Sequence, residues 1–112
     1  MIIIENKQRI QKRLGVSFLI LREFCQQHKI TELSVFGSIL REDFNLDSDI
    51  DLLVKFDPNA HISLMDMIKI EDELKILLKR NIDLVSKKAI ENRKNWIRHQ
   101  NILNNAEIIY VQ

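Results

Sequence analysis

Two aspartates separated by a single residue, Asp49 and Asp51, are the first candidates for chemistry in this 112-residue chain. They open an aliphatic run that is typical of a β-strand, and residues two apart on a strand point to the same face of the sheet. Neighbouring carboxylates are costly without a cation, and Mg²⁺ prefers hard oxygen ligands of this kind. The pair therefore predicts a site for a divalent metal ion.

A third aspartate, Asp83, repeats the surroundings of Asp51. The segments Ile50-Asp51-Leu52 and Ile82-Asp83-Leu84 each place an aspartate between two aliphatic residues in a short β-like run. If the two strands are neighbours in the sheet, Asp49 shares a face with both other aspartates, and the three carboxylates form a cluster. The alternative is that Asp83 only caps a turn or pairs with a nearby Lys or Arg.

Gly37 and Ser38, upstream of the aspartate pair, are candidates for binding phosphate. Gly37 lets the backbone approach a ligand without a Cβ, and the Ser38 hydroxyl can donate to a phosphate oxygen. We expect the preceding strand to end at Gly37 and a helix to follow, because the free N–H groups and dipole at a helix start favour an anion. A Gly-Ser pair alone would equally fit an ordinary turn, but its spacing to the aspartate pair favours a phosphate site.

The spacing of apolar residues predicts the elements that position these groups. The second helix carries an apolar stripe that includes Cys25 and His28, so we expect the lone cysteine to be a core residue and the histidine to lie at the boundary of the core. Ser17 and Ser63 are candidate helix caps. Helices are expected over residues 5–13, after Ser17, after Ser63 and from Lys88 to about Asn104, and strands over Glu32–Phe36, Asp49–Phe56, Asn81–Ser86 and Glu107–Val111.

Composition limits the class of protein. With 46% hydrophobic and 29% charged residues and a single proline, the chain is expected to fold as one soluble domain over residues 1–112. No apolar run approaches the roughly 18 residues of a membrane span, and the apolar start at residues 1–4 lacks the basic flank of an export signal. We therefore expect no membrane association and a cytoplasmic location.

Charge is distributed unevenly along the chain, although the net charge is only +1. Residues 42–51 carry acidic side chains and no basic one, whereas the charged residues of segment 87–99 are basic except for Glu91. The basic segment either docks a partner or a phosphate or is a solvated helix face. Because the net charge is small and aromatic residues make up only 6% of the chain, we expect no direct binding of nucleic acid.

The stretch VFGSILREDFNLDSDIDLLV, residues 35–54, resembles the signature of the DNA polymerase β-like nucleotidyltransferase superfamily, and more narrowly that of the minimal nucleotidyltransferases, called MNT. The likeness continues at Asn81–Ser86, the place of the family's third carboxylate strand. Residues 1–14 lie outside it and are expected to form an N-terminal helical extension. The resemblance implies an α/β (α+β) nucleotidyltransferase fold with a small mixed sheet flanked by helices. Two positions depart from the pattern: Ile39 follows the Gly-Ser where a small or basic residue is common, and Glu42 follows the Arg where glycine is common.

The resemblance also implies a role for each residue that matches the signature. One set would bind the triphosphate of ATP, a second set would hold two Mg²⁺ ions, and the third aspartate would in addition help to activate the acceptor hydroxyl. The residues carried over in this way are Gly37, Ser38, Arg41 and Ser48 at the nucleotide, and Asp49, Asp51 and Asp83 at the metal ions and the reaction.

The resemblance to the MNT family implies that the chain is an antitoxin, which transfers AMP from ATP to a tyrosine hydroxyl of a HEPN-domain ribonuclease toxin. The chain length leaves no room for a further module to hold an acceptor, so we expect recognition to come from the acceptor itself. Two alternatives stay open. One is a non-catalytic module that silences its partner by contact alone, against which the three intact aspartates argue. The other is a nucleotidyltransferase that acts on RNA or on a small molecule.

Overall fold

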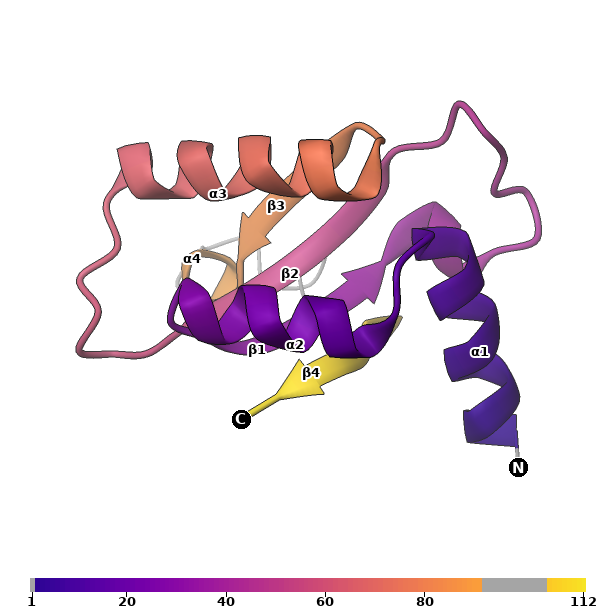
Figure 1. Cartoon of the computed structure of the whole chain (residues 1–112), viewed down its shortest axis with the longest axis horizontal. Helices are drawn as coiled ribbons and strands as arrows, with labels where there is room; N and C mark the ends of the chain where they lie inside the picture. Colours follow the sequence, from indigo (N-terminus) through magenta and orange to yellow (C-terminus); the bar gives the residue numbers. More distant parts are fainter. Residues whose placement is uncertain (1, 92–104) are drawn as a thin grey trace.

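The computed structural model describes residues 2–91 and 105–112 (Figure 1). Within these residues the centre of the fold is a four-stranded sheet in the order β3-β2-β1-β4. Strand β1 (Ile30–Phe36) runs antiparallel to both β2 (Ile50–Phe56) and β4 (Glu107–Val111), whereas β2 and β3 (Ile82–Ser86) are parallel. The expected mixed sheet flanked by helices is thus confirmed, with each predicted strand shifted by no more than two residues at its start.

Helices α2 (Phe18–Gln27) and α3 (Leu64–Leu78) cover one face of the sheet (Figure 1). Because β2 alternates its side chains, Ile50, Leu52 and Val54 all point into the core beneath these helices and are fully buried. Helix α3 is the crossover that joins β2 to the parallel strand β3, as a parallel pair requires. The hydrophobic core therefore fixes β2 and β3 side by side.

Helix α1 (Ile2–Leu14) lies at the side of the sheet, next to the end of β1 (Figure 1). Its side chains Ile10 and Leu14 are 2% and 1% exposed and belong to the same core cluster as the strands. The segment expected as an N-terminal helical extension is a helix, and it contributes side chains to the core.

Both predicted serine caps are present. Ser17 Oγ accepts a hydrogen bond from the Ile20 N–H at 3.3 Å. At the start of α3, Ser63 and Asp66 bond each other's backbone N–H groups in a reciprocal capping box, at 3.1 and 2.9 Å. Each cap satisfies a donor that the helix itself leaves free.

The apolar stripe of α2 also behaves as predicted. Cys25 is fully buried and unpaired, and its burial raises the pKa of the thiol to about 12, which suits a core residue and not a reactive thiolate. His28 lies at the edge of the core, where its ring contacts Phe24 and its Nε2 lies 2.7 Å from Glu73 of α3. That contact links the two helices that cover the sheet.

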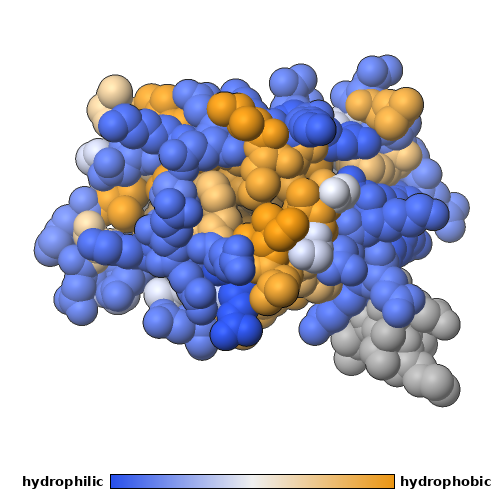
Figure 2. Space-filling view, viewed as in Figure 1, coloured by the Kyte–Doolittle hydropathy of each residue, from blue (hydrophilic) through white to orange (hydrophobic). Residues whose placement is uncertain are grey.

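Apolar residues gather in a band across the face that α2 and α3 present to the viewer, between polar margins (Figure 2). Large apolar side chains are exposed on both helices: Leu19 and Ile20 on α2, and Leu64, Met65, Ile68 and Ile76 on α3. No helix among the described residues is long and apolar enough to cross a membrane.

Candidate active site

The parallel pairing of β2 and β3 brings the aspartates together. Ile50 pairs with Ile82 and Asp51 with Asp83, so the two repeated segments lie in the same register on neighbouring strands. Asp49 directly precedes β2 and lies at the same end of the sheet. The predicted pairing of the two strands is therefore confirmed, whereas the chemical roles of the aspartates stay predictions.

Gly37 lies directly against the Asp51 carboxylate. Its φ of +73° is in the left-handed region that favours glycine, and a Cβ built on it would collide with Asp51 Oδ2. Any side chain at position 37 would force the Asp51 carboxylate to move. The glycine of the signature thus serves two needs, a backbone turn and the close approach of an acidic side chain.

The expected helix after Gly37 is present, but it is only a single 3-10 turn, η1 (Gly37–Leu40). The Arg41 N–H closes the turn on the Ser38 carbonyl at 2.9 Å, after which Arg41 is extended and the chain leaves as a loop. A four-residue turn has little dipole, so a phosphate here would depend on individual N–H groups. The Ser38 hydroxyl itself donates to the Asp49 carbonyl at 3.3 Å, which ties the turn to the start of β2.

The electrostatics of the site centre on Asp51. Burial first, and then the negative charges of Asp83 and Asp49, raise the pKa of the Asp51 carboxyl, while Arg41 lowers it. Asp51 is half-buried, and Asp49 and Asp83 are exposed. The fold thus holds three acidic groups within electrostatic reach of one another, and Arg41 is close enough to offset part of their repulsion.

The donors at this end fit a hard cation that also binds phosphate. Among residues 2–91 and 105–112, no three Asp, Glu, His or Cys side chains are close enough to hold a metal ion by themselves, so the carboxylates form a looser group than the sequence predicted. Mg²⁺ commonly takes only one or two protein carboxylates and completes its shell with phosphate oxygens and water. Asp49 and Asp51 suit that role because they provide hard oxygens beside η1, which we call the phosphate turn after its predicted ligand.

Ser48 lies in the loop just before Asp49, where it closes a turn. Its hydroxyl accepts the Asn45 N–H at 3.0 Å, and its own N–H bonds the Asn45 carbonyl at 3.1 Å. A cavity of about 440 Å³ opens beside it, with Lys75, Lys79 and Arg80 in its lining. The predicted nucleotide-binding serine therefore has a structural partner and also borders a basic hollow.

Sequence reasoning missed Arg13, Phe44 and Arg80, which surround the loop between the phosphate turn and Asp49. Both guanidinium groups lie over the Phe44 ring, at 5.2 Å from Arg13 and 4.4 Å from Arg80. Neither arginine belongs to a motif or an apolar period, and residue 13 precedes the signature by more than twenty positions. Only the folded arrangement shows that they meet.

The basic segment 87–98 is described only in part. Helix α4 (Lys87–Glu91) is the start of the helix predicted from Lys88 to about Asn104, and residues 92–104 lie outside the described part of the chain. Lys87 forms an ion pair with Glu32 of β1 at 2.7 Å. The proposed contact of this segment with a partner or a phosphate stays a prediction.

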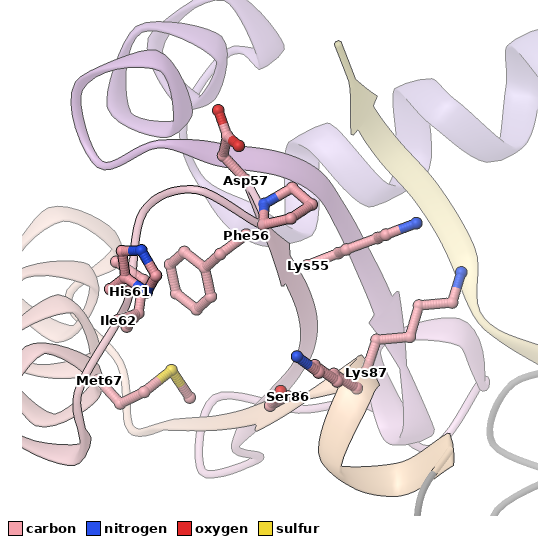
Figure 3. Close-up of a pocket in the computed structure, with 10 residues that line it drawn as sticks. Lys55, Phe56, Asp57, His61, Ile62, Met67, Ser86 and Lys87 are labelled. Atoms are coloured by element: carbon pink, nitrogen blue, oxygen red, sulfur yellow. The ribbon is translucent and has the colours of Figure 1, made fainter.

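A second hollow of about 470 Å³ lies at the opposite end of the sheet (Figure 3). The Phe56 ring and the Met67 thioether face its interior, whereas the ammonium groups of Lys55 and Lys87 extend away from these apolar groups (Figure 3). None of the predicted site residues lines this cavity. Its size alone does not make it the centre of the chemistry.

Residues 19–109 match the family model of the nucleotidyltransferase domain, and the chain belongs to that family. The match includes every residue that the sequence proposed for the site, but it leaves out helix α1. The resemblance to the DNA polymerase β-like nucleotidyltransferases is therefore confirmed.

Proteins similar in sequence to this chain are named protein adenylyltransferases. Protein adenylyltransferase MntA of Thermococcus cleftensis is 35% identical over 71 residues, which cover 63% of this chain and 70% of that protein. A Methanocaldococcus jannaschii protein with the provisional name protein adenylyltransferase is 33% identical over 66 residues, 59% of this chain and 66% of its own length. The chain thus spans about two thirds of the length of these relatives.

Solved structures agree in fold. A structure with the provisional name minimal nucleotidyltransferase is 27% identical and has a TM-score of 0.63. The match covers 91% of this chain and 94% of that one. A complex of a tri-AMPylated HEPN toxin with an MNT antitoxin from Shewanella oneidensis has a TM-score of 0.60 at 15% identity, over 92% of this chain and 73% of that one. The second likeness shows the fold alone.

Proposed function

We propose that this chain is a protein adenylyltransferase that transfers AMP from ATP to a tyrosine hydroxyl of a cognate HEPN-domain toxin and thereby acts as its antitoxin. The observation that carries the proposal is the in-register pair Asp51 and Asp83, with Gly37 packed against the Asp51 carboxylate. The names of the adenylyltransferase relatives and the toxin complex of similar fold support the choice of acceptor.

The acceptor hydroxyl attacks the α-phosphorus of ATP, the bond to the pyrophosphate oxygen breaks, and the hydroxyl proton is released. The residues Gly37 and Ser38 hold the phosphates, and Arg41 supplies positive charge next to Asp51. Asp49 and Asp51 would hold the Mg²⁺ ions, with Asp83 as a further ligand. When bound, the ions neutralise charge on the phosphates and on the departing pyrophosphate.

Asp83 serves the acceptor side in this proposal. It is exposed and stands on β3, the strand at the edge of the sheet, so a hydroxyl that arrives from solvent can reach it. Its carboxylate accepts the hydrogen bond of the acceptor hydroxyl and takes its proton as the new phosphorus–oxygen bond forms. Asp83→Asn should therefore slow the transfer more than it weakens the binding of ATP.

A protein acceptor agrees with the surface of the molecule. The apolar side chains exposed on α2 and α3 form the kind of surface that a partner protein covers. The reaction needs ATP, and we place it in the cytoplasm, without a membrane and without direct contact to nucleic acid.

The test is the transfer of label from α-labelled ATP to the purified HEPN partner, with and without Mg²⁺. Wild-type protein should label the partner only with Mg²⁺, and Asp49→Asn should not label it at all. Neutralisation of the toxin without any label, by both proteins, would favour the non-catalytic module. Label that enters RNA or a small molecule instead of the partner would move the acceptor to another class.

A further inference from the structure

The shape of the loop of residues 41–49 matters for the proposed function. The loop joins the phosphate turn η1 to Asp49, so its shape sets where the phosphates lie relative to the carboxylates. It nevertheless contains no regular secondary structure, and most of its side chains are exposed. Its own hydrogen bonds, such as those between Asn45 and Ser48, shape turns within the loop, so its position against the sheet depends on contacts with the rest of the fold.

Two arginines from distant parts of the chain reach its two ends. Arg13 of α1 donates from Nη1 to the Ile39 carbonyl at 2.8 Å and also to the Arg41 carbonyl. Arg80, which follows α3, donates from Nη1 to the Ser48 carbonyl at 2.8 Å and to the Asn45 carbonyl at 3.0 Å. The entry and the exit of the loop are therefore each held by one guanidinium group.

Phe44 joins the two arginines at the middle of the loop. Its ring lies 5.2 Å from the Arg13 guanidinium and 4.4 Å from that of Arg80, within the range of a cation–π contact. The ring also packs against the hydrophobic core. A planar guanidinium can stack on a ring and donate to carbonyls at the same time, which an ammonium cannot do.

Helix α1 is firmly placed to supply Arg13. Ile10 and Leu14 anchor the helix in the core, and Ile39, which departs from the family pattern, is fully buried in the same cluster. The unusual isoleucine thus has a physical reason, because it packs the phosphate turn into the cluster to which α1 contributes. Arg13 itself precedes residues 19–109, the part that matches the family model.

We propose that Arg13 and Arg80 are positioning residues, which hold the loop around Phe44 and so fix the phosphate turn relative to Asp49. Helix α1 then helps to position the active-site loop through Arg13, although it touches no reacting atom. The kinetic consequence rests on the proposed function, whereas the restraint of the loop does not.

The test compares Arg13→Met with Arg9→Met, a matched change at an exposed position of the same helix. Methionine keeps the apolar stem and removes the donors. Amide hydrogen exchange within residues 40–48 should become about 10-fold faster in Arg13→Met, since a bond to a charged donor holds the loop, and should stay at the wild-type rate in Arg9→Met. Equal exchange in the two variants would overturn the restraint.

Kinetics then separate positioning from mere stability. In the complex with the HEPN partner, Arg13→Met should raise the KM for ATP about 10-fold and leave the KM for the partner unchanged, and Arg13→Lys should recover only part of the loss. Faster exchange with an unchanged KM for ATP would overturn the positioning role. If Arg13→Met fails to fold, Arg80→Met tests the other end of the loop in the same way. Absence of transfer by the wild type would contradict the proposed function and leave the exchange result to decide the restraint.

Discussion

The two ends of the sheet balance their charges in opposite ways. At the carboxylate end, burial and the negative charges of Asp83 and Asp49 raise the pKa of Asp51, and Arg41 offsets only part of the rise. At the lysine end, which we define by the cavity lined by Lys55, Lys87 and Lys88, one of the lysines is paired with a carboxylate of the fold. There Lys87 pairs with Glu32 at 2.7 Å, and Asp57 accepts the Asn59 N–H at 2.9 Å within a turn.

This difference favours the carboxylate end as the place of the ligand. The lysine end offers a cavity of about 470 Å³ with an apolar interior, and Lys87 in its lining already has a carboxylate partner in Glu32. The carboxylate end keeps like charges together at an energetic cost, which a bound cation would offset. The unbalanced charge is therefore a better guide to the chemistry than the size of the hollow.

The largest expected difference between the two ends is in the rate of transfer after the loss of one carboxylate charge. Asp51→Asn should reduce transfer on the order of 1,000-fold or more, because the carboxylate is part of a set that acts as a unit. Asp57→Asn at the lysine end should leave the rate unchanged, since asparagine can still accept the turn hydrogen bond. Initial rates of label transfer measure both, and a comparable loss in the two variants would erase the contrast between the ends.

The two glycines of the chain provide the next contrast. Gly37 and Gly15 both have positive φ, +73° and +78°, so alanine at either should cost ~1–2 kcal/mol of unfolding free energy. Only at Gly37 would the new Cβ meet Asp51, because nothing lies within 4 Å at Gly15. Gly37→Ala should therefore abolish most of the transfer, whereas Gly15→Ala should lose stability alone. Equal activities would show that the position of the Asp51 carboxylate does not matter.

A stability effect without an activity effect is expected at the lysine end. The ion pair of Lys87 with Glu32 is partly buried, with side chains 27% and 16% exposed, so Lys87→Met should cost about 1–2 kcal/mol of unfolding free energy. Urea unfolding measures the loss, and the transfer rate below the unfolding transition should match the wild type. A drop in the rate of folded protein would give this end a part in the reaction.

The smallest expected effect is a pH-dependent gain of stability in Asp51→Asn. The folded-state pKa of Asp51 is raised, so the folded state loses stability as pH rises from the unfolded pKa through the folded one. Asparagine carries no charge, so the variant should be more stable than wild type at pH 7. The two should be equally stable at a pH low enough to protonate Asp51 in both the folded and the unfolded state. Melting curves along a pH series measure the difference, and a variant that is less stable at pH 7 would contradict the repulsion at this end.

Much of the site follows from local sequence. The repeat around Asp51 and Asp83 carries its own alternation of faces, and the parallel pairing places the two in register. The length of η1 could not be foreseen, since whether a turn continues as an α-helix depends on contacts made later in the chain. The arginines around Phe44 could not be found either, because residues 13, 44 and 80 share no period and meet only after folding.

The most direct test of the central claim is the amount of AMP that enters the HEPN partner from α-labelled ATP in the presence of Mg²⁺. Wild-type protein should transfer label that remains on the partner after denaturation, and Asp51→Asn, folded and bound to the same partner, should transfer none. Label transferred equally by wild type and Asp51→Asn would contradict the account.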